Sequence, residues 1–170
     1  MSSDGEHPPD WATNRPTLLF RSLPRDGGLS TADRNALRRF AGRLTLEVAG
    51  GRPFVCLVTN DRELQRLNKS FLGHDYPTDV LSFPAASPAG ELGEMAISIE
   101  RAAAQAAAFR HSLLNESRIL MLHGVLHLIG FDHERDRGRM AREERKWRAH
   151  FELPEGLIER SRKYAAGVKA

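Results

Sequence analysis

Three histidines in the stretch HGVLHLIGFDH have the residue type and spacing of metal ligands. His123 and His127 are four residues apart, so on a helix they lie one turn apart on the same face. Gly130 can end that helix in a left-handed conformation, and the reversed chain would bring His133 back toward the other two. Three neutral imidazoles leave the fourth tetrahedral position open for water, as in catalytic zinc sites. We therefore predict one metal ion per chain, Zn²⁺ or another divalent transition metal, held by His123, His127 and His133.

The same stretch lacks the general base of the zinc proteases whose ligand spacing it matches. Their pattern is H-E-x-x-H-x-x-G-x-x-H, and Gly124 stands where they carry a glutamate that takes a proton from water. A glycine inside a helix costs about 1 kcal/mol relative to alanine, so a packing or access reason is expected for it. Neutral ligands would leave the ion its full charge, which favours an anionic substrate such as a phosphodiester over a peptide. A metalloprotease is therefore disfavoured.

The elements that must position these histidines alternate between strands and helices along the chain. The helix expected at 115–129 is apolar almost all round and is predicted to be the central buried one. Strands are expected at residues 17–22, 53–59, 79–83 and 94–99. The other helices are expected to start at Ser30 and Asn60, to follow the cap Ser98, and to span 136–151. We predict an α+β fold, with a small mixed, mostly parallel four-stranded sheet covered by about five helices, including a zincin-like metal helix.

Length and composition indicate one globular domain. The chain has 170 residues, of which 41% are hydrophobic and 28% charged, enough for a sizeable core. We expect a flexible tail at residues 1–16, a catalytic domain at 17–152 and a C-terminal extension at 153–170. No apolar run approaches the ~20 residues of a membrane span, and the first residues lack the pattern of a secretory signal. A cytoplasmic protein without membrane contact is therefore expected, and Cys56, in an apolar run, is predicted to be buried and inert.

The charge balance leans only weakly toward anionic partners. Lysine and arginine number 25 against 22 acidic residues, for a formal net charge of +3. That is not the strongly basic signature of a dedicated DNA binder, so no DNA partner is expected. Basic residues crowd the segment 135–148, but acidic residues are mixed among them. This segment fits either a solvated helix face with i,i+4 ion pairs or a face that contacts RNA.

Two longer motifs resemble the signatures of one bacterial family. HGVLHLIGFDH is similar to the H-G-x-L-H-L-x-G-[FY]-D-H signature of the YbeY proteins, and LNKSFLGHDYPTDVLSFP resembles their second signature. The resemblance covers about residues 53–150. It implies a single α+β domain that holds a metal on the three histidines. It also implies a single-strand-specific endoribonuclease in late 3′-end maturation of small-subunit rRNA and in ribosome quality control, with ribosomal RNA and the small ribosomal subunit as partners.

The second signature also supplies candidate site residues. The resemblance places Thr78, Asp79, Ser82 and Phe83 along the metal-bearing cleft, where Thr78 is a candidate RNA contact. Asp79 and Ser82 are either catalytic candidates or loop and strand-start residues that satisfy backbone groups. Asp132, in the histidine motif, either orients a ligand histidine as a hydrogen-bonded carboxylate or caps the loop.

One position departs from the family pattern. Leu72 stands where many members carry an arginine that has been thought to contact RNA or assist cleavage, and leucine cannot bind phosphate. Lys69, Arg66 and His74 are nearby residues that could supply the missing charge, and Lys69 and His74 are candidate RNA contacts. The alternative is an activity that depends less on a cation at this position.

These residues give three alternative hypotheses for the function. The leading hypothesis is a metal-dependent endoribonuclease in rRNA maturation. The second is a non-catalytic ribosome-assembly or RNA-binding factor whose structural metal holds the loop after Gly130. The third is a metalloprotease, which Gly124 disfavours. The residues do not identify the acid that protonates the leaving group.

Overall fold

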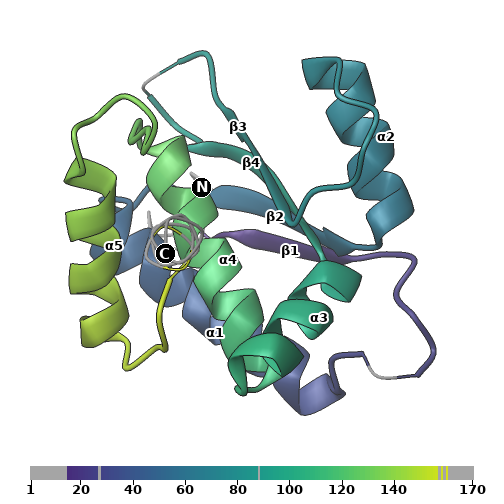
Figure 1. Ribbon diagram of the computed structural model, residues 1–170. Helices are drawn as coiled ribbons and strands as arrows, with labels where there is room; N and C mark the ends of the chain where they lie inside the picture. The colour runs from purple at the N-terminus through teal and green to yellow at the C-terminus, as the bar shows by residue number, and fades with distance from the viewer. Residues whose placement is uncertain (1–14, 27, 88, 157, 159, 161–170) are drawn as a thin grey trace, which may run out of the picture.

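A mixed four-stranded sheet forms the centre of the molecule (Figure 1). The computed structural model describes residues 15–26, 28–87, 89–156, 158 and 160, so the expected tail lies almost entirely outside the described residues. The strand order is β1-β2-β4-β3, in which β1 pairs parallel with β2, β2 parallel with β4, and β3 antiparallel with β4. The strand bounds are β1 (Thr17–Phe20), β2 (Phe54–Thr59), β3 (Val80–Pro84) and β4 (Gly93–Ser98). The predicted small, mostly parallel sheet is confirmed.

Five α-helices in the described part of the chain cover this sheet, as predicted. Their bounds are α1 (Thr31–Arg43), α2 (Asp61–Leu72), α3 (Ile99–Phe109), α4 (Leu113–Leu128) and α5 (Arg139–His150). The expected caps are present, because the side chains of Ser30, Asn60 and Ser98 each accept a hydrogen bond from the first turn of their helix. The sequence pattern did not predict the π-helical turn η2 (Leu44–Val48) that continues α1.

The two faces of the sheet are covered by different helices. In β4, Met95 and Ile97 belong to the large core that includes residues of α1, α4 and α5. Ala96 points to the opposite face, where Leu64 of α2 packs against it and against Leu81 of β3. This alternation follows from the two-residue period of a strand. The middle of the sheet therefore has buried side chains on both faces, as expected where strands run mostly parallel.

The predicted central helix is α4. Eleven of its sixteen residues are buried, and it lies between α3 and α5 across the sheet (Figure 1). Because α4 is wrapped by protein on most sides, the side chains at its C-terminal end have fixed surroundings. Among the described residues, no helix combines the length and the apolar character that a membrane span requires.

Candidate metal centre

The last turns of α4 bring two histidines together. The helix begins after Ser112, whose hydroxyl accepts a hydrogen bond of 3.1 Å from the N–H of Asn115. Near the other end, the side chain of His123 is buried and that of His127 is half-buried. Their Nε2 atoms are 3.1 Å apart. The four-residue spacing therefore converges two imidazole nitrogens at one point, as the sequence predicted.

A glycine turn returns the third histidine to the other two. Gly130 has a φ of +105°, and the N–H groups of Gly130 and Phe131 bond to carbonyl groups at the end of α4. His133 is exposed, and its ring centroid lies 5.6 Å from that of His123 and 5.3 Å from that of His127. One nitrogen of each ring lies within 4.8 Å of the other two. The three predicted ligands thus form one cluster.

The chemistry of this cluster fits a transition metal. Burial, together with the rings of His123 and His133, lowers the pKa of His127 to about 4. His127 is therefore neutral near pH 7, and a neutral imidazole has a lone pair to give to a metal ion. Two nitrogens bound to zinc at about 2.0–2.1 Å in a tetrahedral arrangement lie about 3.3 Å apart, close to the 3.1 Å between the Nε2 atoms of His123 and His127. The three histidines can hold a metal ion.

The carboxylate that contacts the histidine cluster comes from α5. Oε1 of Glu144 lies 3.2 Å from Nδ1 of His123, and both side chains are buried. An ionised carboxylate only accepts hydrogen bonds, so Nδ1 of His123 is the donor in this contact, and the neutral form of the ring then has its lone pair on Nε2, toward the cluster. Burial raises the pKa of Glu144, but the hydrogen bond and charge of His123, with smaller effects of Ile158 and Arg148, leave it below its usual value.

Glu144 is not among the site residues predicted from the sequence. This residue lies in the mixed-charge segment 135–148, which fitted a solvated or RNA-contacting face. In the structure, α5 buries Met140, Glu144 and Arg148, which recur every four residues. The one signal in the sequence was the spacing of Glu144 from Met140, which places an acidic residue on the apolar face of the helix.

Gly124 is explained by close packing between α4 and the sheet. A Cβ atom at this position would lie 2.9 Å from Sδ of Met95 and 3.2 Å from Oγ of Ser82. The hydroxyl of Ser82 also donates a hydrogen bond of 3.2 Å to the carbonyl oxygen of Gly124. The expected packing reason is therefore present, and side chains of β3 and β4 fill the space beside the helix. A glutamate at this position would displace them.

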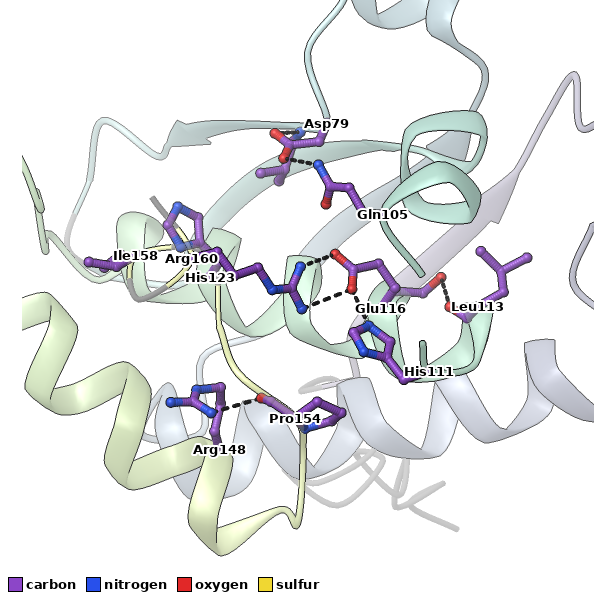
Figure 2. A network of polar contacts seen from close by, with 12 residues as sticks. Asp79, Gln105, His111, Leu113, Glu116, His123, Arg148, Pro154, Ile158 and Arg160 are labelled. Carbon is purple, nitrogen blue, oxygen red and sulfur yellow. Dashed lines mark hydrogen bonds and ion pairs between the residues drawn. The ribbon is translucent and has the colours of Figure 1, made fainter. Parts of the chain in front are cut away.

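The candidates of the second signature have structural contacts. One carboxylate oxygen of Asp79 accepts hydrogen bonds from the N–H of Val80 (2.8 Å) and the hydroxyl of Thr78 (3.4 Å). The other oxygen accepts a bond of 3.0 Å from the side chain of Gln105 in α3 (Figure 2). Asp79 thus ties the start of β3 to α3, while Ser82 ties β3 to α4. These contacts favour the structural alternative for Asp79 and Ser82.

Asp132 lies in the turn between α4 and His133. Its side chain accepts a hydrogen bond of 3.1 Å from the N–H of Glu134 and lies 3.9 Å from the guanidinium of Arg135. This geometry favours the loop-capping alternative, since Glu144 is the carboxylate that contacts His123.

The candidate RNA contacts near the end of α2 are exposed. The ammonium of Lys69 pairs with Asp75 at 2.8 Å, and Nδ1 of His74 lies 3.3 Å from the hydroxyl of Tyr76. Leu72, the last residue of α2, is 54% exposed. This end of the helix therefore presents polar and apolar side chains to solvent together.

Fold and site together define an α+β protein whose buried helix and following turn form a three-histidine cluster that can hold a metal ion. Residues 35–152 match the model of the family described as Endoribonuclease YbeY, and the chain belongs to this family. It is 56% identical over 144 residues to Endoribonuclease YbeY of Solibacter usitatus, covering 85% of this chain and 93% of that protein. It is also 52% identical over 109 residues to Endoribonuclease YbeY of Koribacter versatilis, covering 64% of this chain and 71% of the relative.

A solved structure shares the fold. The solution structure of a protein from Thermotoga maritima superposes with a TM-score of 0.54 at 22% identity, covering 77% of this chain and 86% of the other. At this identity the comparison supports the α+β fold alone.

Proposed function

We propose that this chain is a single-strand-specific, metal-dependent endoribonuclease that acts late in the 3′-end maturation of small-subunit rRNA and in ribosome quality control in the cytoplasm. The observation that carries the proposal is the cluster of His123, His127 and His133, in a chain whose relatives are named endoribonucleases. Its partners would be ribosomal RNA and the small ribosomal subunit.

The histidine cluster supplies the ligand set for this chemistry. Each ring offers one nitrogen, and the hydrogen bond from Nδ1 of His123 to Glu144 leaves Nε2 of that ring for the ion. A zinc ion held there supplies Lewis-acid stabilisation of charge on a phosphodiester and activates water near neutral pH. Neutral imidazoles do not compensate the charge of the ion, so an anionic backbone is the favoured substrate. Lys69, His74 and Thr78 remain our candidates for RNA contacts.

A non-catalytic RNA-binding or ribosome-assembly factor is the second candidate function. One observation favours it: the side chains of Asp79, Ser82 and Asp132 all make hydrogen bonds that hold the fold together. In that case the metal would hold the loop after α4 in place. A metalloprotease is not proposed, because Met95 and Ser82 leave no room at Gly124 for the missing base.

The deciding experiment is cleavage of an RNA that contains the 3′ end of the small-subunit rRNA by purified, zinc-supplemented protein. We expect the wild-type protein to cleave this RNA. We expect no cleavage by His127→Ala, because only two of the three histidine ligands would remain to hold the metal ion. His150→Ala is the matched control, since His150 lies at the end of α5 and pairs with Glu47. The same RNA annealed to a complementary strand tests the single-strand preference.

The outcomes separate the candidate functions. RNA binding without turnover at any metal supplement would favour the assembly factor. Equal cleavage by the wild type and His127→Ala would show that the histidine cluster is not the active centre.

A further inference from the structure

Polar contacts join the described residues beyond α5 to α4 and α5. We call Leu153–Gly156, Ile158 and Arg160 the C-terminal segment. Arg148 donates a hydrogen bond of 2.8 Å to the carbonyl oxygen of Pro154, and the N–H of Ile158 lies 3.4 Å from Oε2 of Glu144. The guanidinium of Arg160 forms two bonds, of 2.8 and 3.0 Å, with the carboxylate of Glu116 in α4 (Figure 2). The family match ends at residue 152, so the C-terminal segment lies beyond it, whereas its partners Arg148, Glu144 and Glu116 lie within it.

One of these contacts involves the carboxylate of Glu144, which also contacts His123 of the histidine cluster. Oε1 of Glu144 faces Nδ1 of His123 at 3.2 Å, while Oε2 faces the N–H of Ile158. The side chain of Glu144 is 1% exposed. Its two oxygens therefore connect a candidate ligand in α4 to the backbone of the C-terminal segment.

Gly156 leaves the space that this carboxylate occupies. A Cβ atom at residue 156 would lie 2.6 Å from Cδ of Glu144 and 2.7 and 2.8 Å from its two oxygens. Contacts this short are not tolerated, so any side chain here would displace the carboxylate. The backbone of the segment thus approaches Glu144 closely and limits where it can sit.

We propose that Glu144 is a positioning residue for His123 and that the C-terminal segment holds Glu144 in place, so that the segment sets the metal affinity of the centre. The inference rests on the proposed metal role of the three histidines. A carboxylate that accepts the Nδ1–H of a ligand histidine fixes its tautomer and ring orientation and raises the basicity of Nε2. The backbone N–H of Ile158 fixes the carboxylate in turn.

A purely structural role is the competing explanation. Glu144 would then only satisfy the N–H of Ile158 and stabilise the C-terminal segment. The two explanations differ in the property that changes on mutation. A positioning role changes zinc affinity, whereas a structural role changes the stability of the metal-free protein alone.

The test compares zinc affinities of the full-length wild type and two variants, measured by competition with a chelator. Glu144→Gln keeps the shape of the side chain but offers one acceptor oxygen for two donors, so we expect zinc binding about 10- to 100-fold weaker. Gly156→Ala substitutes neither the three histidines nor Glu144, but its added Cβ displaces the Glu144 carboxylate. We therefore expect the zinc affinity to fall about tenfold. Gly42→Ala is the matched control, because a Cβ there meets nothing within 4 Å.

A double variant and a spectroscopic signal tie the effect to Glu144. In a Glu144→Ala background the carboxylate is gone, so Gly156→Ala should cause no further loss of affinity. In NMR spectra of the metal-free protein, the Nδ1–H proton of His123 should be observed in the wild type and in Gly42→Ala. It should be lost or shifted in Glu144→Gln and Gly156→Ala.

Thermal melts of the metal-free proteins show whether each variant still folds cooperatively. Glu144→Gln and Gly156→Ala proteins that melt cooperatively and bind zinc as tightly as the wild type would overturn the inference. So would a variant whose metal-free form no longer melts cooperatively, because that indicates a structural role. A wild-type protein that binds no zinc would instead refute the metal centre itself, and with it this inference.

Discussion

Each clustered imidazole contributes one nitrogen, so the loss of any ring leaves an ion with two protein ligands. His123 and His127 are held by α4, which is packed on most sides, whereas His133 is exposed on the following turn. The two helical rings are therefore the fixed part of the cluster. Protein variants at these two positions test the centre most directly.

We predict that the purified wild-type protein contains close to one zinc or similar transition-metal ion per chain and that His127→Ala contains almost none. Removing one of three ligands weakens binding while α4 stays folded through its other buried residues. Elemental analysis of protein prepared without a histidine tag measures this, with His150→Ala as the control. A metal content that is unchanged in a His123→Ala, His127→Ala double variant would rule out the cluster as the site.

The burial of Cys56 predicts how slowly its thiol reacts in the native protein. It is completely buried in β2, and burial raises the pKa of its thiol to about 12. Near pH 8 the thiol is therefore protonated and shielded, so we predict that a thiol reagent labels it only at the rate of unfolding. Labelling followed with and without denaturant checks this. Rapid labelling of the native protein would contradict the buried position of β2.

The close approach of α4 to the sheet depends on Gly124, which has no side chain. A Cβ at position 124 meets Met95, which is 2% exposed and has little room to move. The gain in helix propensity from alanine is about 1 kcal/mol, while overpacking costs about 1–3 kcal/mol. Overpacking is therefore expected to decide the sign.

We predict that Gly124→Ala lowers the free energy of unfolding by about 1 kcal/mol. Gly42→Ala, in the open position of α1, should leave it unchanged or raise it by up to about 1 kcal/mol. Chemical denaturation of the two variants measures the difference. A Gly124→Ala protein at least as stable as the wild type would show that the side chains of Met95 and Ser82 can move away from α4.

The C-terminal end of α2 carries the departure from the family pattern. Leu72 is exposed, so an arginine there needs no burial of charge. We predict that Leu72→Arg leaves the melting temperature unchanged and strengthens RNA binding by about 1 kcal/mol, the value of one added charge-assisted contact. Lys69→Ala should weaken binding by a similar amount, and it should leave stability almost unchanged because its ion pair with Asp75 is exposed.

RNA affinities read beside thermal melts test this pair of substitutions. If both proteins stay folded and neither affinity changes, the end of α2 does not face RNA. The substrate groove would then lie elsewhere around the histidine cluster.

At the scale of the whole molecule, a buried ion pair between Arg160 and Glu116 joins the C-terminal segment to α4. Glu116 is fully buried and Arg160 is 5% exposed, and His111 also contacts the Glu116 carboxylate. Figure 2 shows the three side chains meeting beside α4. Removing one member of a buried pair leaves the other charge without its partner.

We predict that Arg160→Ala lowers the free energy of unfolding by about 3 kcal/mol or more. Arg62→Ala, on the exposed surface of α2, should change it by less than about 0.5 kcal/mol. Denaturant titrations of both variants provide the comparison. Equal stabilities would mean that the C-terminal segment does not rest on α4 in solution.

Local sequence patterns were sufficient for much of the fold and of the cluster. The four-residue spacing of His123 and His127 and the glycine turn before His133 act within one helix and one loop, so their geometry follows from helical periodicity. The caps Ser30, Asn60 and Ser98 and the alternation in β4 are equally local. These features depend on neighbours a few residues away, which a sequence displays directly.

Contacts between residues far apart in the chain required the tertiary structure. Ser82 meets Gly124 across 42 residues and His123 meets Glu144 across 21, and no local periodicity encodes either pair. The sequence by itself determined which residues have metal-ligand chemistry and which helix carries them. Only the packing of α4, α5 and the C-terminal segment decided which carboxylate orients His123. The physical reason is that burial and close approach depend on where the chain returns in space, and that is a property of the whole fold.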